Sequence, residues 1–214
     1  MFAALPVRAG LFAAALTIVS PALPAGAALF LFNADPFAGT TALETPGRQV
    51  VGNELFIPDF NFATDLFAFD AAAFGIESLS FLNSLAADLP AAGVNVVVVR
   101  DTDNDNDPLT AFNAGSAAGL IAAQINTPTP GFFIYHNSGL GLNRLVFSTD
   151  LSETTSDLKV VARLTNPIGS DAIALMPSIS AANFQVVPEP ASIVLALASV
   201  AGLATLRRKQ AGLA

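Results

Sequence analysis

The chain carries at residues 94–100 the run Val-Asn-Val-Val-Val-Val-Arg, and this run decides the fold class. Its β-branched side chains favour an extended strand. Apolar residues at successive positions place apolar groups on both faces of that strand, which is typical of a fully buried strand. We therefore predict a sheet with residues 94–100 at its centre.

Other segments add strands on both sides of this run. A helix is predicted over residues 116–125, where apolar side chains recur at helical spacing and Asn113 or Ser116 can cap the first turn. Residues 49–57 are interpreted as a hairpin with Gly52 and Asn53 in its turn. Further strands are expected at residues 29–32 (buried), 65–70, 131–136, 143–149, 158–164 and 182–187 (an edge strand). Many strands with one helix predict an α+β fold: an antiparallel-dominated sheet with one or two helices, or alternatively a β-sandwich.

The C-terminal end combines a proline motif, an apolar segment and a basic cluster. The motif is Pro188-Glu189-Pro190, and the cluster is Arg207-Arg208-Lys209. The sixteen residues between them, 191–206, carry no charge. Such a segment prefers the bilayer and the basic cluster the cytoplasmic side. We predict a transmembrane helix at 191–206, about 24 Å long and short for a permanent span of a roughly 30 Å core, as suits a temporary anchor.

These three parts, in this order, resemble the PEP-CTERM sorting signal of Gram-negative bacteria, here at residues 187–214. In that family the tripeptide is recognised by a membrane-embedded processing enzyme, an exosortase. The resemblance implies export, transient tethering to the inner membrane, removal of the tail, and deposition at the cell surface or in the exopolysaccharide matrix of a biofilm. The rival interpretation is an ordinary tail anchor with an accidental Pro-Glu-Pro. Residues 131–164 also resemble a recurrent uncharacterised domain of exported PEP-CTERM proteins, to which no activity is attached.

The N-terminal end has the features of a secretory signal peptide. Arg8 is the only charged residue before Asp35, and residues 10–19 form a ten-residue apolar core. Ala25 and Ala27 are small residues at the −3 and −1 positions of a cleavage site after Ala27. We predict a signal peptide at residues 1–27 and a secreted globular domain at 28–186. An uncleaved anchor is less consistent with so short an apolar core.

The body between the two ends is strongly acidic and has no cysteine. Residues 28–187 hold five basic and sixteen acidic side chains, a net charge of −11. This charge repels phosphate backbones, which argues against nucleic-acid binding, and is compatible with divalent cations and with polysaccharide. The absence of cysteine excludes disulfides, thiol catalysis and zinc-thiolate sites. The fold must therefore be held by its apolar core.

One acidic loop follows the strand at 94–100 directly. It places four carboxylates on alternate residues: Asp101, Asp103, Asp105 and Asp107. This spacing resembles the first half of a calcium loop, and four close carboxylates repel one another in the absence of a cation. Asn106 stands where an EF-hand has glycine, and Phe112 stands where the closing glutamate belongs. Calcium is thus a candidate cofactor; the alternative is a solvated acidic turn.

No catalytic constellation stands out. His136 is the only histidine, and no nucleophile elbow accompanies it. No spacing singles out a pair of carboxylates, and the chain has no tryptophan and one tyrosine to bind sugars. We therefore expect a non-enzymatic surface or matrix protein whose partners are the secretion machinery, an exosortase and extracellular polysaccharide. The alternatives are a secreted carboxylate-dependent hydrolase of matrix polysaccharide and a calcium-stabilised glycan-binding module.

Overall fold

The computed structural model describes residues 26–188, in which strands dominate a mixed α/β fold. The strands are β1 Leu29–Phe32, β2 Val50–Val51, β3 Leu55–Ile57, β4 Leu66–Asp70, β5 Phe81–Ser84, β6 Val96–Val99, β7 Gly131–Asn137, β8 Leu142–Ser148, β9 Leu158–Leu164 and β10 Phe184–Val187. The helices are α1 Ala71–Phe74, η1 Ala86–Asp88, α2 Ala114–Ala122, α3 Gly169–Leu175, η2 Met176–Ser178 and η3 Ala181–Asn183. The three α-helices of this part of the chain exceed the one or two expected.

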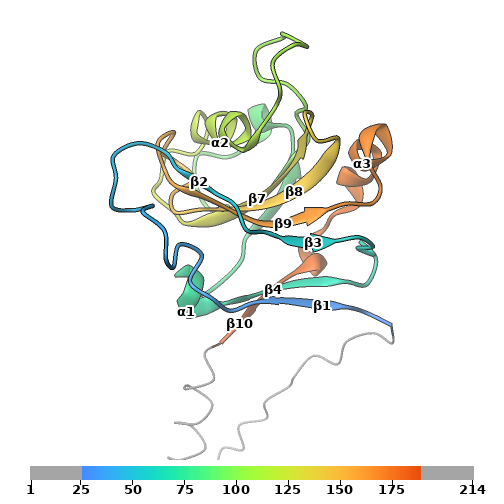
Figure 1. Ribbon diagram of the computed structural model, residues 1–214, viewed down its shortest axis with the longest axis horizontal. Helices are drawn as coiled ribbons and strands as arrows, with labels where there is room; N and C mark the ends of the chain where they lie inside the picture. Colours follow the sequence, from blue (N-terminus) through green and yellow to red (C-terminus); the bar gives the residue numbers. More distant parts are fainter. Residues whose placement is uncertain (1–25, 189–214) are drawn as a thin grey trace, which may run out of the picture.

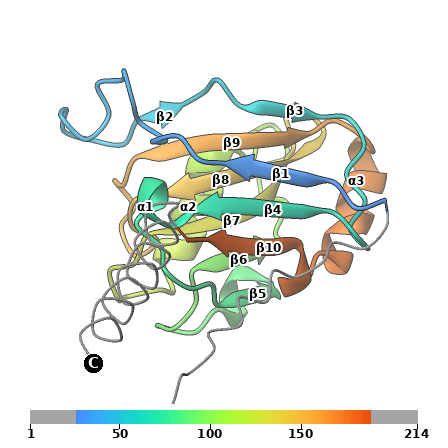
Figure 2. The same ribbon diagram turned by 90° about the horizontal axis from the view of Figure 1, so that it is seen from below.

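Two sheets and one helix form three layers (Figure 1). The large sheet has the strand order β2-β9-β8-β7-β6-β5, with β3 also paired to β9. The small sheet has the order β1-β4-β10 and packs on one face of the large sheet, as Figure 2 shows from below. Helix α2 packs on the opposite face through Ala117 and Ile121. The β-sandwich alternative thus describes the interface between the two sheets. The interface between the large sheet and α2 makes the fold a mixed α/β one.

Most strand pairs are parallel, so the expectation of an antiparallel-dominated sheet was wrong. Six of the eight pairings are parallel, and only β7–β8 and β8–β9 are antiparallel. The strands expected at residues 131–136, 143–149 and 158–164 are present and form an antiparallel meander, while the flanking strands join it by longer connections. The physical signal was present in β6, which is buried along its whole length, because strands covered on both faces are typical of parallel sheets. Strand β6 lies between β5 and β7, an interior position one strand from the edge.

The segment at residues 49–57 does not form the predicted hairpin. Strands β2 and β3 both pair in parallel with β9 and not with each other. Asn53 lies between them with φ of 65°, in the left-handed region that asparagine tolerates. The chain therefore continues in one direction past this residue, and the segment between the strands carries Glu54 against the large sheet.

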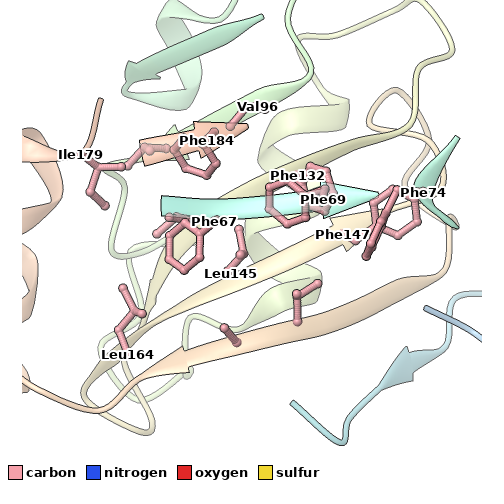
Figure 3. Packing of buried hydrophobic residues seen from close by; sticks show 14 of the residues in the cluster. Phe67, Phe69, Phe74, Val96, Phe132, Leu145, Phe147, Leu164, Ile179 and Phe184 are labelled. Atoms are coloured by element: carbon pink, nitrogen blue, oxygen red, sulfur yellow. The ribbon is translucent and has the colours of Figure 1, made fainter. Parts of the chain in front are cut away.

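Most of the described phenylalanines fill the space between the two sheets (Figure 3). Phe69 of β4 lies over Phe132 of β7, with their ring centroids 3.8 Å apart. Phe74 and Phe147 meet edge to face with centroids 5.1 Å apart. Aromatic pairs of this kind add specific geometry to the area that they bury. This core holds the small sheet on the large one without any disulfide.

Two local features follow directly from the sequence. The side chain of Asn113 accepts hydrogen bonds from the backbone N–H groups of Gly115 and Ser116, at 2.8 and 3.1 Å. Of the two predicted caps, Asn113 is therefore the one that caps α2, which covers 114–122 where 116–125 was expected. Gly131 begins β7 where the backbone oxygen of Asn95 would lie 2.5 Å from a Cβ atom at that position. Only glycine allows strands β6 and β7 to approach this closely without displacement.

Candidate functional sites

The acidic loop after β6 is arranged as a series of turns. The carboxylate of Asp101 accepts a hydrogen bond at 2.7 Å from the backbone N–H of Ala86, which belongs to η1. Asp103, Asp105 and Asp107 each accept from the backbone N–H two residues further on, at 2.9–3.1 Å. These bonds are Asx turns, in which the side chain satisfies its own loop.

The structure does not gather these carboxylates into a cation shell. Within residues 26–188, no three side chains of His, Cys, Asp or Glu lie together as metal ligands would. Asn106 adopts φ of 61°, the left-handed conformation expected where an EF-hand has glycine. The pKa of Asp103 is lowered, chiefly because its carboxylate accepts a hydrogen bond from the backbone N–H of Asp105. Calcium binding at Asp101, Asp103, Asp105 and Asp107 stays a prediction.

The single histidine is part of the core. His136 is buried, and its Nδ1 lies 3.1 Å from Oδ1 of Asn143. The amide nitrogen of Asn143 in turn donates to the backbone oxygen of Ala172 at 2.8 Å, which ties α3 to β8. Because Oδ1 only accepts, Nδ1 of His136 carries the proton. Within residues 26–188, the hydrogen-bond partner of the imidazole is therefore a structural asparagine that joins β8 to α3.

A cluster of three charged side chains, which was not predicted from the sequence, lies on the large sheet. Glu54 projects from the segment between β2 and β3, and its side chain is only 6% exposed. Its Oε1 accepts from Nη2 of Arg144 on β8 at 2.8 Å and from Nε of Arg163 on β9. The two arginines face each other across the β8–β9 pair. The guanidinium of Arg163 also lies over the ring of Phe56, 5.2 Å from its centroid.

The electrostatics of this cluster favour the ionised form of Glu54. Burial alone opposes ionisation, but hydrogen bonds from its own backbone N–H, from Arg144 and from Arg163 outweigh it, so the pKa of Glu54 is lowered. Burial lowers the pKa of Lys159, and the charge of Glu54 acts in the opposite direction. The signal in the sequence was the presence of arginine within the apolar strands β8 and β9, since a charge there needs a partner.

A cavity of about 600 Å³ opens where the edges of the two sheets meet, between β1 and the β2–β3 segment. Its wall is mixed, with Phe32, Phe74 and Val161 among the apolar side chains and Asn33 and Thr40 among the polar ones. Its charged groups are Asp35 and Lys159, and the Lys159 ammonium donates to the backbone oxygen of Gly52. Among the described residues, one acid lines this cavity, so it does not present the facing pair of carboxylates that glycoside hydrolysis uses.

The predicted sorting residues fall mostly beyond the described part of the chain. Pro188 is described; it is exposed and follows the last residue of β10 directly. Glu189, Pro190, Arg207, Arg208 and Lys209 lie outside the described residues, and so does the predicted transmembrane helix at 191–206. Within residues 26–188, the helices are all too short or too polar to span a bilayer.

No protein-family model matches the sequence, and neither a curated protein nor a solved structure is similar to it.

Proposed function

We propose that this chain is an exported, non-enzymatic protein that an exosortase sorts to the cell surface or the exopolysaccharide matrix of a Gram-negative bacterium. One observation carries the proposal: Pro188-Glu189-Pro190, sixteen uncharged residues and Arg207-Arg208-Lys209 follow one another in the order of a sorting signal. In this proposal residues 191–206 form a transmembrane helix that tethers the protein until the tail is removed. A signal peptide at residues 1–27 starts the export.

The arrangement of the fold supports a processing site at this position. Strand β10 ends at Val187, and its register places Val187 beside Asp70 of β4. The Pro-Glu-Pro motif therefore begins one residue after the hydrogen-bonded body of the protein. A cut beyond Pro188 would leave every described strand intact.

The described side chains favour a structural role over the hydrolase alternative. Among the described residues, the cavity beside β1 has Asp35 as its one acid, and Glu54, whose side chain is 6% exposed, is held by two arginines. An ionised carboxylate in such a cluster stabilises the sheet and is a poor general acid, because its pKa is lowered. Calorimetric titration of the full chain with calcium tests the glycan-module alternative. No heat and no change in melting temperature would rule out the calcium-stabilised glycan-binding module.

Mass spectrometry of the extracellular protein tests the proposed sorting. We expect the N-terminus to be Ala28 and peptides from residues 191–214 to be missing. The variant Glu189→Ala should keep those peptides and stay with the membrane fraction, whereas Glu153→Ala, a change to an exposed acid of the body, should be processed normally. Intact protein in the cytosol, with Met1 and Ala214 attached, would refute the proposal.

A further inference from the structure

The small sheet has one face that packs on the core and one that does not. Phe30 and Phe32 of β1, Phe67 and Phe69 of β4, and Phe184 and Val186 of β10 point inward, to the large sheet. Because side chains alternate along a strand, their neighbours point away from it. We call these neighbours the outer face: Leu29, Leu31, Leu66, Ala68, Asp70, Gln185 and Val187.

The outer face is mostly apolar and is open at its β1 edge, whereas Ala68 at its centre is fully buried. Leu29 is 46% exposed and Leu31 is 48% exposed. Leu66 and Val187 are half-buried, and Leu29 pairs with Leu66 in the register of β1 and β4. The two leucines of β1 thus extend an apolar strip onto β4. An exposed strip of this kind is typical of a surface that meets another apolar phase.

The outer face also lacks the charge that covers the rest of the body. The body carries a net charge of −11, yet Asp70 is the one charged residue of this face. Its carboxylate caps α1, because Oδ1 accepts hydrogen bonds from the backbone N–H groups of Ala72 and Ala73, both at 3.0 Å. The acidic loop between β6 and α2 lies on the opposite side of the molecule (Figure 1). The outer face therefore carries one acidic side chain, and the loop with Asp101, Asp103, Asp105 and Asp107 lies on the other side of the molecule.

The chain connects the outer face directly to the apolar segment 191–206. Val187 belongs to the face, and Ala191 is four residues further on. A fully extended chain spans at most about 3.6 Å per residue, so Ala191 lies within about 14 Å of Val187 in any conformation. A bilayer that holds residues 191–206 is therefore within about 14 Å of the end of β10, at one end of the outer face.

We propose that the outer face of the small sheet rests on the bilayer interface while residues 191–206 are inserted in the membrane. Docking buries Leu29 and Leu31 against the lipid and keeps the acidic loop away from it. The Pro-Glu-Pro motif is then held between the body and the membrane surface. This inference depends on the membrane anchor in the proposed function and adds the orientation of the tethered body.

The absence of cysteine from the chain allows single-cysteine labelling of the intact protein. Leu31→Cys places an environment-sensitive fluorophore on the outer face. Leu140→Cys is a matched control in the β7–β8 turn, because Leu140 is 47% exposed. Leu109→Cys is a second control in the acidic loop, 93% exposed. Leu29→Cys repeats the outer-face measurement at an independent position.

Each labelled chain is reconstituted in phosphatidylcholine vesicles, floated on a density gradient and mixed with nitroxide-labelled lipid. We expect the labels at positions 29 and 31 to shift their emission to the blue and to lose intensity with nitroxide lipid. The labels at positions 109 and 140 should do neither.

The possible failures separate the two proposals. Protein that does not float with the vesicles refutes the anchor, and with it the docking. Protein that floats while its position-31 label behaves like the position-140 label refutes the docking alone. A blue shift without nitroxide quenching also overturns the docking, because it shows that protein, from residues 191–206 or a second copy, covers the face instead of lipid.

Discussion

Replacing Glu54 by glutamine tests whether its ion cluster holds the edge of the large sheet. The substitution keeps the shape of the side chain and removes its charge. Arg144, whose side chain is 13% exposed, and the half-buried Arg163 then lose the carboxylate that receives their hydrogen bonds. Both guanidiniums stay charged, so two like charges face each other across β8 and β9.

The expected loss of stability is about 2–4 kcal/mol. Removing one partner of a buried ion pair costs about 3–5 kcal/mol, and Arg163 can recover part of this through its contact with water. Glu44→Gln is the matched control, because Glu44 is exposed and makes no ion pair among the described residues. Its effect should stay within about 0.5 kcal/mol.

The assay is urea unfolding of the full chain in detergent, followed by circular dichroism because the chain has no tryptophan. The pH dependence gives a second readout. The pKa of Glu54 is lowered from its ordinary value of 4.5. Its contribution is therefore fully present above pH 4.5 and is lost as the pH falls through the lower value of the folded state. Glu54→Gln should lack this part of the acid dependence. A loss equal to that of Glu44→Gln, with unchanged acid dependence, would refute the reasoning.

Three further substitutions, read by the same unfolding assay, test the packing. Gly131→Ala should destabilise the protein by about 1–3 kcal/mol, because the new Cβ meets the backbone oxygen of Asn95. Its control, Gly119→Ala in α2, has open space around the new Cβ and should stabilise the protein by about 0.5–1 kcal/mol. Equal effects of the two substitutions would contradict this. Phe69→Ala should cost about 3–5 kcal/mol, against under about 1 kcal/mol for the exposed Phe56→Ala; similar losses would place Phe69 outside the core. Asp157→Ala should cost about 2 kcal/mol, because two backbone N–H groups lose their acceptor; an unchanged midpoint would show that water replaces it.

The parts of the fold that local pattern predicted are those built from sequence neighbours. Strands β7, β8 and β9 follow one another along the chain and pair in that order, so alternation and turns were sufficient to place them. Helix α2 was predicted because Asn113 and the apolar spacing both act within a few residues. In each case the interaction that decides the structure spans a short stretch of chain.

The parallel pairings could not be predicted in the same way. Strand β4 has β1 on one side and β10 on the other. Strand β10 follows β4 in the sequence by more than a hundred residues, and the two strands still pair. Nothing in the local pattern of β10 specifies its partner. The turn at Gly52 and Asn53 has the composition of a hairpin turn, yet both flanking strands gain more from pairing with β9. Propensity was overridden there by tertiary packing.

The candidate sites show the same division. The alternate spacing of Asp101, Asp103, Asp105 and Asp107 was visible in the sequence, but the backbone N–H group that each carboxylate binds was not. The cluster of Glu54, Arg144 and Arg163 joins β8 and β9 to the segment before β3, so it depends on the pairing of β3 with β9. Charges isolated within apolar strands were the available clue.

The pairing of β4 with both the first and the last strand of the body has a consequence for the order of events during synthesis. A ribosome delivers β1 and β4 early and β10 last. The middle strand of the small sheet therefore keeps an open hydrogen-bonding edge until the polypeptide is almost complete. The small sheet is complete only after β10 has been synthesised and has paired with β4. A pause late in translation or transport therefore leaves the free edge of β4 and the phenylalanines beside it exposed, which favours aggregation.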